Sequence, residues 1–324
     1  MKALVYNEYG SPDVLKLTEI VDPVPGESDV LVRVQASSLN DFDWHLLTGR
    51  PLINRLGGLF TPHHLVLGSD VAGRVEAVGR QVTGFRPGDE VFGDVSPFGF
   101  GAFAELVSAP EHAFARKPAR LTMEQAGAVP QAGGLAMVGL RNRGRRPIRP
   151  DDAVLVNGAG GGVGTFAVQI AKAAGATVTG VDRAHKLETV RSVGADRVID
   201  YTQADFTRQG DAYDLILDIA AHRPMSSYRR CLKPGGVCAI TGGSIPRVLL
   251  AMAAGPVVSL FSNRRVGLPF WRPNHPDDVT ALSRLLESGS VVPVVDSVVP
   301  LDQVPDAFRR FGAQLHTGKI VITI

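Results

Sequence analysis

Cysteine is scarce in this sequence: Cys231 and Cys238 are the two cysteines among 324 residues. A disulfide framework needs several paired cysteines, so this usage excludes a disulfide scaffold and is typical of a protein in a reducing compartment. We therefore expect a cytoplasmic protein. The same scarcity excludes a structural zinc lobe held by four cysteines.

An excess of charge of one sign is also lacking. Lys and Arg number 34 against 32 Asp and Glu, and the formal net charge is +2. A dedicated nucleic-acid-binding domain usually has a strongly basic face, so this balance argues against nucleic acid as the partner.

Long hydrophobic runs are missing as well. The longest, Val248–Phe261, contains Gly255 and Pro256 and is too short to cross a bilayer, so we expect no membrane partner. We expect this run to form a buried or interface helix, with a membrane-surface contact as the alternative. The first ten residues, MKALVYNEYG, alternate and lack the apolar core of a signal peptide.

The sequence contains enough apolar residues for two domains, and two parts of the chain show different hydrophobic patterns. Up to about residue 120, short alternating runs are separated by turn-forming Gly and Pro, a pattern that indicates a β-rich barrel or sandwich. We expect strands at Ala3–Tyr6, Val30–Val34, Val71–Val78, Glu90–Phe92 and Ala104–Val107.

In the second pattern, from Ala153 onward, strands alternate with helices, which predicts βαβ units and a parallel sheet. A helix at Leu121–Ala128, capped by Thr122, precedes it, and the run Lys319–Ile324 after it should pair back into a sheet. The expected strands are Ala153–Asn157, Thr177–Asp182, Arg197–Asp200, Leu215–Ile219 and Val237–Thr241, and the expected helices are Thr165–Ala174 and Lys186–Val193.

Glycines gather between the first of these strands and its helix, with the spacing Gly158-x-x-Gly161-x-x-Gly164. A diphosphate rests on bare backbone N–H groups at a helix N-terminus, where a side chain would block its approach. The match to GxGxxG is imperfect because Val163 stands where its last glycine would be. We expect the cofactor to contact Gly158, Gly160, Gly161, Gly162, Val163 and Gly164, the alternative being a glycine-rich turn with no ligand.

The choice between NAD and NADP depends on the residues at the end of the next strand. Asp182 lies eighteen residues after Gly164 and is placed to accept the ribose hydroxyls, which favours NAD, or else to cap the following helix. Arg183 and Lys186 follow it, and a cation there pairs with the 2′-phosphate of NADP. The sequence leaves NAD and NADP both open.

These motifs resemble the medium-chain dehydrogenase/reductase family, in its zinc-free quinone oxidoreductase-like branch. The resemblance covers essentially the whole chain, and its landmarks are MKALVYNEYGSPDVL, SLNDFDWHLLTG, GSDVAGRVEAVG, FRPGDEVFG, NGAGGGVGTFAVQIAK, VGADRVIDY and HTGKIVITI. It implies an α/β fold: a GroES-like β-rich catalytic domain at 1–122 and 266–324, and a Rossmann domain with a doubly wound parallel sheet at 123–265. It also implies an active site in the cleft between them and a homodimer.

The resemblance further implies that zinc is absent. The His-Glu pair of zinc-dependent relatives is replaced by Ser69-Asp70, and the region of their first cysteine ligand reads Ser38-Leu39-Asn40. His63 and His64 are adjacent in sequence, which is poor geometry for one tetrahedral ion.

Catalytic and cofactor residues follow from the same resemblance. The amide of Asn40 would reach the nicotinamide ribose or the substrate carbonyl, with Asp43 supporting its loop; the alternative is that both make turn contacts only. His45 is a candidate proton donor, or a surface histidine. On the cofactor side we expect Thr241, Gly242 and Gly243 near the nicotinamide and Tyr201 near the adenosine.

Two departures from the family pattern stand out. Leu135 occupies the place of a threonine near the nicotinamide, and Gly133-Gly134 should loosen that segment, with Gln131 as a substitute polar contact. The run Arg141–Arg149 contains five arginines and is expected to be a solvated loop, or else an anion-binding patch.

Together these features predict an NAD(P)H-dependent reductase that transfers hydride to quinones or α,β-unsaturated carbonyls. One alternative is a zinc-free alcohol dehydrogenase or carbonyl reductase. A second is a catalytically weak nucleotide-binding scaffold or RNA-binding protein.

Overall fold

A computed structural model describes residues 1–55, 58–141, 147–210, 212–260, 263–269 and 271–324. The chain forms two compact units. The first comprises Met1–Ala132, Pro273–Val279 and Pro293–Ile324, and the second comprises Gly133–Arg272 and Thr280–Val292. The sequence prediction puts the boundaries at 122/123 and 265/266, whereas the second compact unit begins at Gly133, runs to Arg272 and also includes Thr280–Val292.

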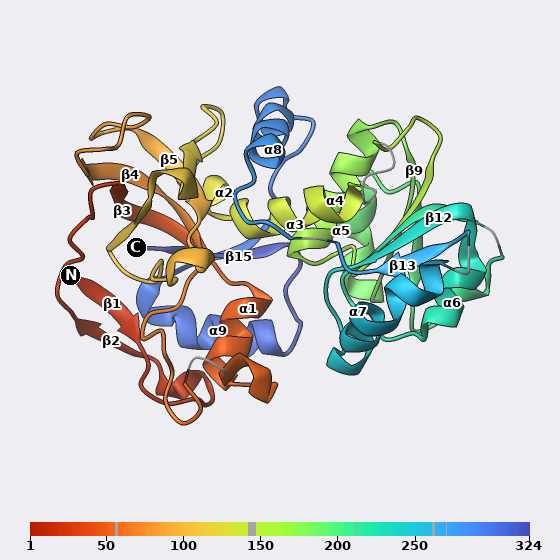
Figure 1. The fold of residues 1–324 in the computed structure, drawn as a ribbon, viewed down its shortest axis with the longest axis horizontal. Coiled ribbons are helices and arrows are strands. Elements are labelled where there is room, and N and C mark those ends of the chain that lie inside the picture. Colours follow the sequence, from red (N-terminus) through yellow and green to blue (C-terminus); the bar gives the residue numbers. More distant parts are fainter. Residues whose placement is uncertain (56–57, 142–146, 211, 261–262, 270) are drawn as a thin grey trace. The chain divides into compact units, whose positions relative to one another are not determined.

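The first unit is built on a sheet whose central strand is β3 (Figure 1). Among the described residues the strand order is β14-β15-β3-β4-β5-β7, with β6 also paired to β3. All pairs are antiparallel except β14 with β15. The strands are β3 (Asp29–Ser38), β4 (Asp70–Val78), β5 (Glu90–Asp94), β6 (Leu106–Pro110), β7 (Phe114–Arg116), β14 (Val295–Pro300) and β15 (Lys319–Thr323). A separate antiparallel pair is formed by β1 (Lys2–Val5) and β2 (Lys16–Glu19).

Alternation along the strands decides which side chains enter the core of this unit. In β3, Val30, Val32 and Val34 are buried, whereas Arg33 and Gln35 point to solvent. Helices contribute Phe308 and Leu47 to a second buried apolar cluster. The helices with residues in this unit are α1 (Asp41–Thr48), α2 (Met123–Gly127), α9 (Val304–Gly312) and the starts of α3 (Pro130–Leu140) and α8 (Pro276–Ser288).

The second unit is a parallel sheet of order β10-β9-β8-β11-β12-β13 in the described chain. Numbered within the unit this order is 3-2-1-4-5-6, the doubly wound Rossmann arrangement, whose direction reverses between β8 and β11. The strands are β8 (Ala153–Asn157), β9 (Thr177–Asp182), β10 (Arg197–Asp200), β11 (Tyr213–Asp218), β12 (Leu232–Ile240) and β13 (Arg265–Gly267).

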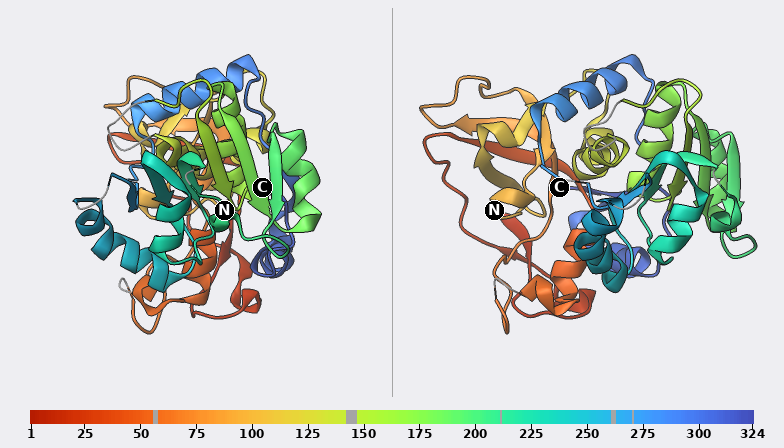
Figure 2. Two further views of the ribbon diagram at one scale, coloured as in Figure 1. Left: turned by 90° about the vertical axis from the view of Figure 1, so that its right-hand side faces the viewer. Right: turned by 45° about the vertical axis from the view of Figure 1, so that its right-hand side comes forward.

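Helices lie on both faces of the parallel sheet (Figure 2). Helices α4 (Gly162–Ala173) and α5 (Leu187–Ser192) contact β8, β9 and β10, whereas α6 (Met225–Cys231) and α7 (Ile245–Leu260) contact β12 and β13. This covering of both faces explains why β8 reads as a continuous apolar run rather than an alternating one. The predicted α/β fold class is confirmed, with one β-rich unit and one unit built on a doubly wound parallel sheet.

Most predicted elements are confirmed, several with shifted ends. Strands β8, β9 and β10 begin and end as predicted, and Thr122 caps α2 by accepting a hydrogen bond from the Gln125 N–H at 3.2 Å. Strand β12 begins five residues earlier than predicted. Val248 lies in α7, as expected, and no helix of the described residues has the length and apolar character needed to span a membrane.

The expectation for the segment around Gly133-Gly134 is wrong. Residues 130–140 form one continuous helix, α3, rather than a loosened segment. The reason lies at Gly134, where an added Cβ would come 2.8 Å from the indole ring of Trp271. The glycine therefore permits close side-chain packing and does not interrupt the helix.

Most of the arginine run, residues 142–146, lies outside the described residues.

Candidate active site and cofactor loop

A buried polar cluster lies at one edge of the β-rich unit, where three paired strands meet. Asn40 follows the end of β3, Asp70 begins β4 and Lys319 begins β15. Both β4 and β15 run antiparallel to β3, so their starts lie beside its end. Sheet register therefore brings together three polar side chains that are up to 279 positions apart in the sequence.

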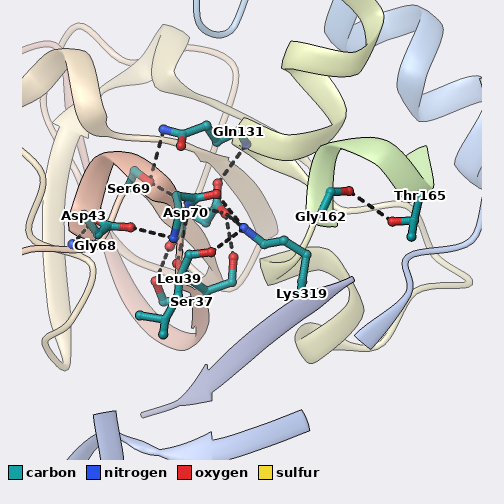
Figure 3. Close-up of polar contacts among 12 residues, drawn as sticks. Ser37, Leu39, Asp43, Gly68, Ser69, Asp70, Gln131, Gly162, Thr165 and Lys319 are labelled. Atoms are coloured by element: carbon teal, nitrogen blue, oxygen red, sulfur yellow. Dashed lines mark hydrogen bonds and ion pairs between the residues drawn. The ribbon is translucent and has the colours of Figure 1, made fainter. Parts of the chain in front are cut away.

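The ammonium of Lys319 is the positive centre of this cluster (Figure 3). Its Nζ donates hydrogen bonds to the Leu39 carbonyl at 2.9 Å and to Asn40 Oδ1 at 2.5 Å, and it lies 3.2 Å from Asp70 Oδ2. The Lys319 side chain is 3% exposed and that of Asp70 is 0% exposed. A buried ammonium needs this set of acceptors, because its charge is otherwise costly to remove from water.

The amide of Asn40 is held on both sides by protein groups. Its Oδ1 accepts from Lys319, and its Nδ2 donates to Ser69 Oγ at 3.0 Å and to Asp70 Oδ2 at 2.9 Å. Asp70 accepts further hydrogen bonds from the Ser38 hydroxyl at 2.6 Å and the Gln131 N–H at 2.8 Å. The side-chain amide of Asn40 is therefore fixed in one orientation, and the sequence alternative of turn contacts alone does not describe it.

Asp43 lies in the first turn of α1 and fixes the start of that helix. Its Oδ2 accepts from the backbone N–H of Asn40 at 3.0 Å, and its Oδ1 accepts from that of Gly68 at 3.0 Å. Burial raises the pKa of this carboxyl group to about 7, with the nearby charge of Asp70 adding to the rise. Asp43 thus ties the Asn40 loop to the segment that carries Ser69 and Asp70.

The donor groups at this site are unlike those of a zinc centre. Within the described ranges, no group of three or more His, Cys, Asp or Glu side chains is placed to hold a metal ion. At the position of the zinc enzymes' histidine, Ser69 Oγ accepts from the amides of Asn40 and Gln131, the latter at 3.3 Å. Gln131 thus belongs to the polar cluster, and its suggested contact near the nicotinamide stays a prediction.

His45, the candidate proton donor, is half-buried on α1. Its Nδ1 lies 2.8 Å from the carbonyl oxygen of Arg50. One ring nitrogen is therefore engaged by the backbone of the loop that follows the helix.

The Rossmann unit places the glycine loop at the carboxyl end of β8. Gly158 has φ +85°, a conformation that favours glycine, and Gly161 is the residue before the first turn of α4. A Cβ on Gly164 would come 2.1 Å from the carbonyl oxygen of Gly158, so only glycine permits this approach. The Thr165 hydroxyl donates to the Gly162 carbonyl at 3.0 Å (Figure 3). The loop thus presents a helix N-terminus with little side-chain cover, the geometry that suits a diphosphate.

Asp182 braces this loop from the end of β9. Its Oδ2 accepts from the Gly160 N–H at 2.7 Å, and its Oδ1 accepts from the Arg183 N–H at 2.8 Å. The residue is 8% exposed. The carboxylate points back to the glycine loop, so the alternative of a cap for the following helix is not what the structure shows.

The two basic residues after Asp182 differ in position. The Arg183 Nε donates to the Tyr201 hydroxyl at 2.7 Å, and both side chains are exposed at the edge of the sheet. Lys186 is 6% exposed, and a Cβ on Gly160 would meet its Cβ at 2.6 Å. Lys186 therefore lies under the glycine loop, and Arg183 with Tyr201 is the pair that solvent reaches.

The predicted nicotinamide-side residues follow β12 at the carboxyl edge of the sheet. Gly243 has φ +117°, and a Cβ there would come 2.1 Å from the Ala221 nitrogen. The Thr241 N–H donates to the Asp218 carbonyl at 2.9 Å. Asp218, at the end of β11, accepts from the Asn157 amide at 2.8 Å, and burial raises the pKa of its carboxyl group. The ends of β8, β11 and β12 are thereby held together.

Sequence reasoning missed Lys319 as part of the site and treated Asp70 only as a lost zinc ligand. The available signal for Lys319 was a lysine at the start of the apolar run KIVITI, in a strand predicted to pair into a sheet. A charge at the start of a buried strand needs a partner. The sequence does not say which partner it is, because register decides that.

Comparison with known proteins agrees with this architecture. Residues 26–119 match the model of the alcohol dehydrogenase GroES-like domain, and residues 193–322 match that of zinc-binding dehydrogenases. The chain is 34% identical to a 2-methylene-furan-3-one reductase of Solanum lycopersicum and 35% identical to an NADPH-dependent alkenal/one oxidoreductase of Arabidopsis thaliana. Each alignment covers 99% of this chain and 79% of the relative.

A solved quinone oxidoreductase from Coxiella burnetii has the same fold, with a TM-score of 0.88 at 24% identity over 100% of this chain and 99% of that one. The order of motifs, the strand topology of both units and the relatives aligned over 99% of this chain all indicate the same family. The chain therefore belongs to the medium-chain dehydrogenase/reductase family, in its quinone oxidoreductase-like branch, and is an NAD(P)H-dependent oxidoreductase.

Proposed function

We propose that this protein reduces quinones or α,β-unsaturated carbonyl compounds by hydride transfer from a reduced nicotinamide, without zinc. The observation that carries the proposal is the loop at residues 158–164, where bare backbone N–H groups meet the N-terminus of α4. The whole-length similarity to an NADPH-dependent alkenal/one oxidoreductase supports the acceptor class.

The absence of a catalytic zinc in this proposal rests on the chemistry of the polar cluster. Neutral amides and hydroxyls of Asn40, Gln131 and Ser69 are poor ligands for Zn²⁺, which prefers thiolate, imidazole and carboxylate groups. The Asp70 carboxylate, which the Asn40 amide contacts, is already paired with the ammonium of Lys319. A second cation beside this ammonium would be repelled.

The nicotinamide, when bound, supplies the hydride, and the residues of this chain position the reactants. In our proposal the hydride adds to the β-carbon of the acceptor, and a proton from water completes the reduced product. Lys319 and Asp70 hold the Asn40 side chain in a fixed orientation, and Asp43 holds its backbone. Such preorganisation lowers the cost of placing a polar group beside the reacting carbonyl.

We propose a preference for NADPH over NADH. Two backbone N–H groups already hold the carboxylate of Asp182, whereas the exposed guanidinium of Arg183 lies beside the Tyr201 hydroxyl. A guanidinium with a neighbouring hydroxyl suits the 2′-phosphate of NADPH. We also propose a cytoplasmic homodimer, on the grounds of the two free cysteines and the family resemblance.

The test is a panel of enones, quinones, aldehydes and ketones assayed with NADPH and NADH, following the loss of nicotinamide absorbance. The proposal predicts turnover of enones or quinones at rates well above those for saturated aldehydes and ketones. Cofactor binding without turnover of any acceptor would contradict it, as would a preference for saturated carbonyls.

A further inference from the structure

One helix of the Rossmann unit presents large apolar side chains to solvent. On α7, at the edge of this unit (Figure 1), Leu249, Leu250 and Met252 are 45%, 43% and 57% exposed. The other side of the helix packs on the sheet, because Ala251 is buried with Val266 of β13 in one apolar cluster. An exposed apolar face next to a packed one marks an interaction site.

The exposed face runs along the helix. Four exposed residues recur at the i, i+3, i+4, i+7 spacing that defines one helix face: Pro246, Leu249, Leu250 and Ala253. Arg247 is the one charged residue between the helix ends. Within the described ranges no helix has the length and apolar character to span a membrane, so α7 can meet a bilayer only at its surface.

The part of the chain that contains α7 is strongly basic. Between Asp218 and Asp277 the sequence has no Asp or Glu, but it has seven Arg and one Lys. The whole chain has a formal net charge of +2, so this segment holds a local excess of positive charge that the rest of the sequence offsets.

Helix α6 brings part of this charge to the same face of the sheet. Tyr228 and Cys231 of α6 are buried in the same cluster as Ala251 of α7, so the outer sides of both helices face away from the sheet together (Figure 1). Arg230 is exposed on α6. Two cations of the segment pair with carboxylates earlier in the chain, at 3.7 Å and 2.7 Å, whereas no described acidic residue forms an ion pair with Arg230 or Arg247.

We propose that the α6–α7 surface, defined by Leu249, Leu250, Met252, Arg230 and Arg247, docks on an anionic lipid bilayer. Helix α7 lies in the plane of the bilayer, and its apolar side chains enter the boundary between headgroups and acyl chains. The two arginines contact the phosphates of anionic lipids. The bilayer thus covers the apolar face and neutralises the charge beside it.

Charge distinguishes a bilayer from a second copy of this chain. A two-fold contact would set the α6–α7 surface against itself and bring its arginines toward those of the partner. Residues 219–276 contain no carboxylate that could neutralise them. RNA would satisfy the arginines but would leave the leucines in water. A bilayer with anionic lipids satisfies both kinds of side chain.

Sedimentation of the full-length protein with lipid vesicles tests the proposal. The protein should pellet with phosphatidylcholine vesicles that contain about one third phosphatidylglycerol, and high salt should weaken this binding. Vesicles of phosphatidylcholine alone should bind at least about tenfold more weakly, because each arginine near an anionic surface strengthens binding about fivefold.

The apolar part of the surface is tested by Leu249→Gln/Leu250→Gln. Glutamine is a good helix former, so α7 should persist, while binding to the anionic vesicles should weaken about tenfold or more. Val21→Gln/Val24→Gln is the matched control, because these valines of the β-rich unit are 90% and 88% exposed and lie outside the α6–α7 surface. Circular dichroism shows whether each variant is folded.

The charged part is tested by Arg230→Gln/Arg247→Gln, which should weaken binding to the anionic vesicles about tenfold or more and reduce its dependence on salt. Arg191→Gln, on α5, removes another exposed arginine and should bind as wild type does.

Wild-type protein that stays in the supernatant with anionic vesicles would overturn the inference, as would equal binding by wild type and the folded leucine variant. A dimer in the absence of lipid that the leucine variant dissociates, with no vesicle binding by wild type, would assign the surface to a second copy of the chain instead. Binding to RNA that the arginine variant loses and the leucine variant keeps, again without vesicle binding, would assign it to nucleic acid.

Discussion

Lys319 and Asp70 form an ion pair whose two side chains are both buried, at the point where three strands meet. An ion pair of this kind adds little net stability over an apolar pair, but removing one partner leaves the other charged and buried. Its second effect is on Asn40, whose Oδ1 accepts from the same ammonium. Lys319 therefore connects the stability of the β-rich unit to the orientation of a candidate catalytic amide.

The variant Lys319→Met should lower the free energy of unfolding by about 3–5 kcal/mol, because it leaves the Asp70 carboxylate without its cation. Urea denaturation measures this loss. The double variant Lys319→Met/Asp70→Asn should recover a substantial part of it, since no charge then remains buried. A loss of under about 1 kcal/mol in the single variant would show that the pair does not hold the cluster together.

Asp43 should make stability fall as pH rises. Its pKa is about 7 in the folded protein, above the usual aspartate value of 3.8, so the folded state keeps a proton that the unfolded chain has lost. The stabilising contribution of the protonated carboxyl group is complete below about pH 4 and is lost as pH rises through about 7. Against Asp43→Asn as the matched reference, wild type should lose up to about 1.4 kcal/mol per pH unit in this window. Equal pH dependence of the two proteins in urea denaturation would refute the assignment.

Arg183→Ala should raise the KM for NADPH about tenfold and leave that for NADH nearly unchanged, because only NADPH carries the phosphate that a guanidinium binds. Initial rates with each cofactor measure the two constants. Arg191→Ala removes another exposed arginine, on α5, and serves as the control. An equal rise for both cofactors would mean that Arg183 does not recognise the 2′-phosphate.

At the scale of elements, the link between β8 and α4 carries the cofactor site. The strand ends at Asn157 and the helix begins at Gly162, so four residues make the turn. The glycines in and just after this turn differ in how much room a side chain would have. A Cβ on Gly164 would collide with the Gly158 carbonyl at 2.1 Å, whereas one on Gly161 would lie 3.5 Å from that oxygen, at an ordinary φ of −83°.

This difference gives a matched pair of variants. Gly161→Ala should fold with an unchanged or slightly higher Tm, because its backbone conformation suits alanine, and yet bind NADPH at least about tenfold more weakly because its methyl group covers the diphosphate site. Gly164→Ala should lower Tm, since backbone atoms must move. Fluorescence titration and thermal melts measure the two effects. Unchanged NADPH affinity in Gly161→Ala would contradict the location of the diphosphate.

The sequence predicts elements well where one local pattern decides them. Strands β8, β9 and β10 begin and end where predicted because each is a short apolar run bounded by turn or cap residues. At Gly133-Gly134 the sequence predicts a loosened segment where the structure has a helix, since the role of Gly134 depends on the distant Trp271 ring. The partners of Lys319 were out of reach for the same reason, because the pairing of β15 with β3 decides them.

At the scale of the whole molecule, each unit supplies one part of the proposed chemistry. The Rossmann unit has the open N-terminus of α4 and the exposed Arg183, which suit a nicotinamide dinucleotide phosphate. The β-rich unit has the fixed amide of Asn40 and the buried ammonium of Lys319. Our central proposal is that hydride passes from the reduced nicotinamide to a conjugated acceptor with no metal ion taking part.

The most direct test of this claim follows the hydrogen itself. Protein dialysed against a chelator, with its zinc content measured, is given NADPH deuterated at C4 of the nicotinamide, on the transferring face, and 2-cyclohexen-1-one, and the product is analysed by NMR. The account predicts cyclohexanone with one deuterium at the former β-carbon, formed at a rate that added zinc does not raise. Deuterium at the carbonyl carbon of an allylic alcohol, or activity that appears only with zinc, would contradict it.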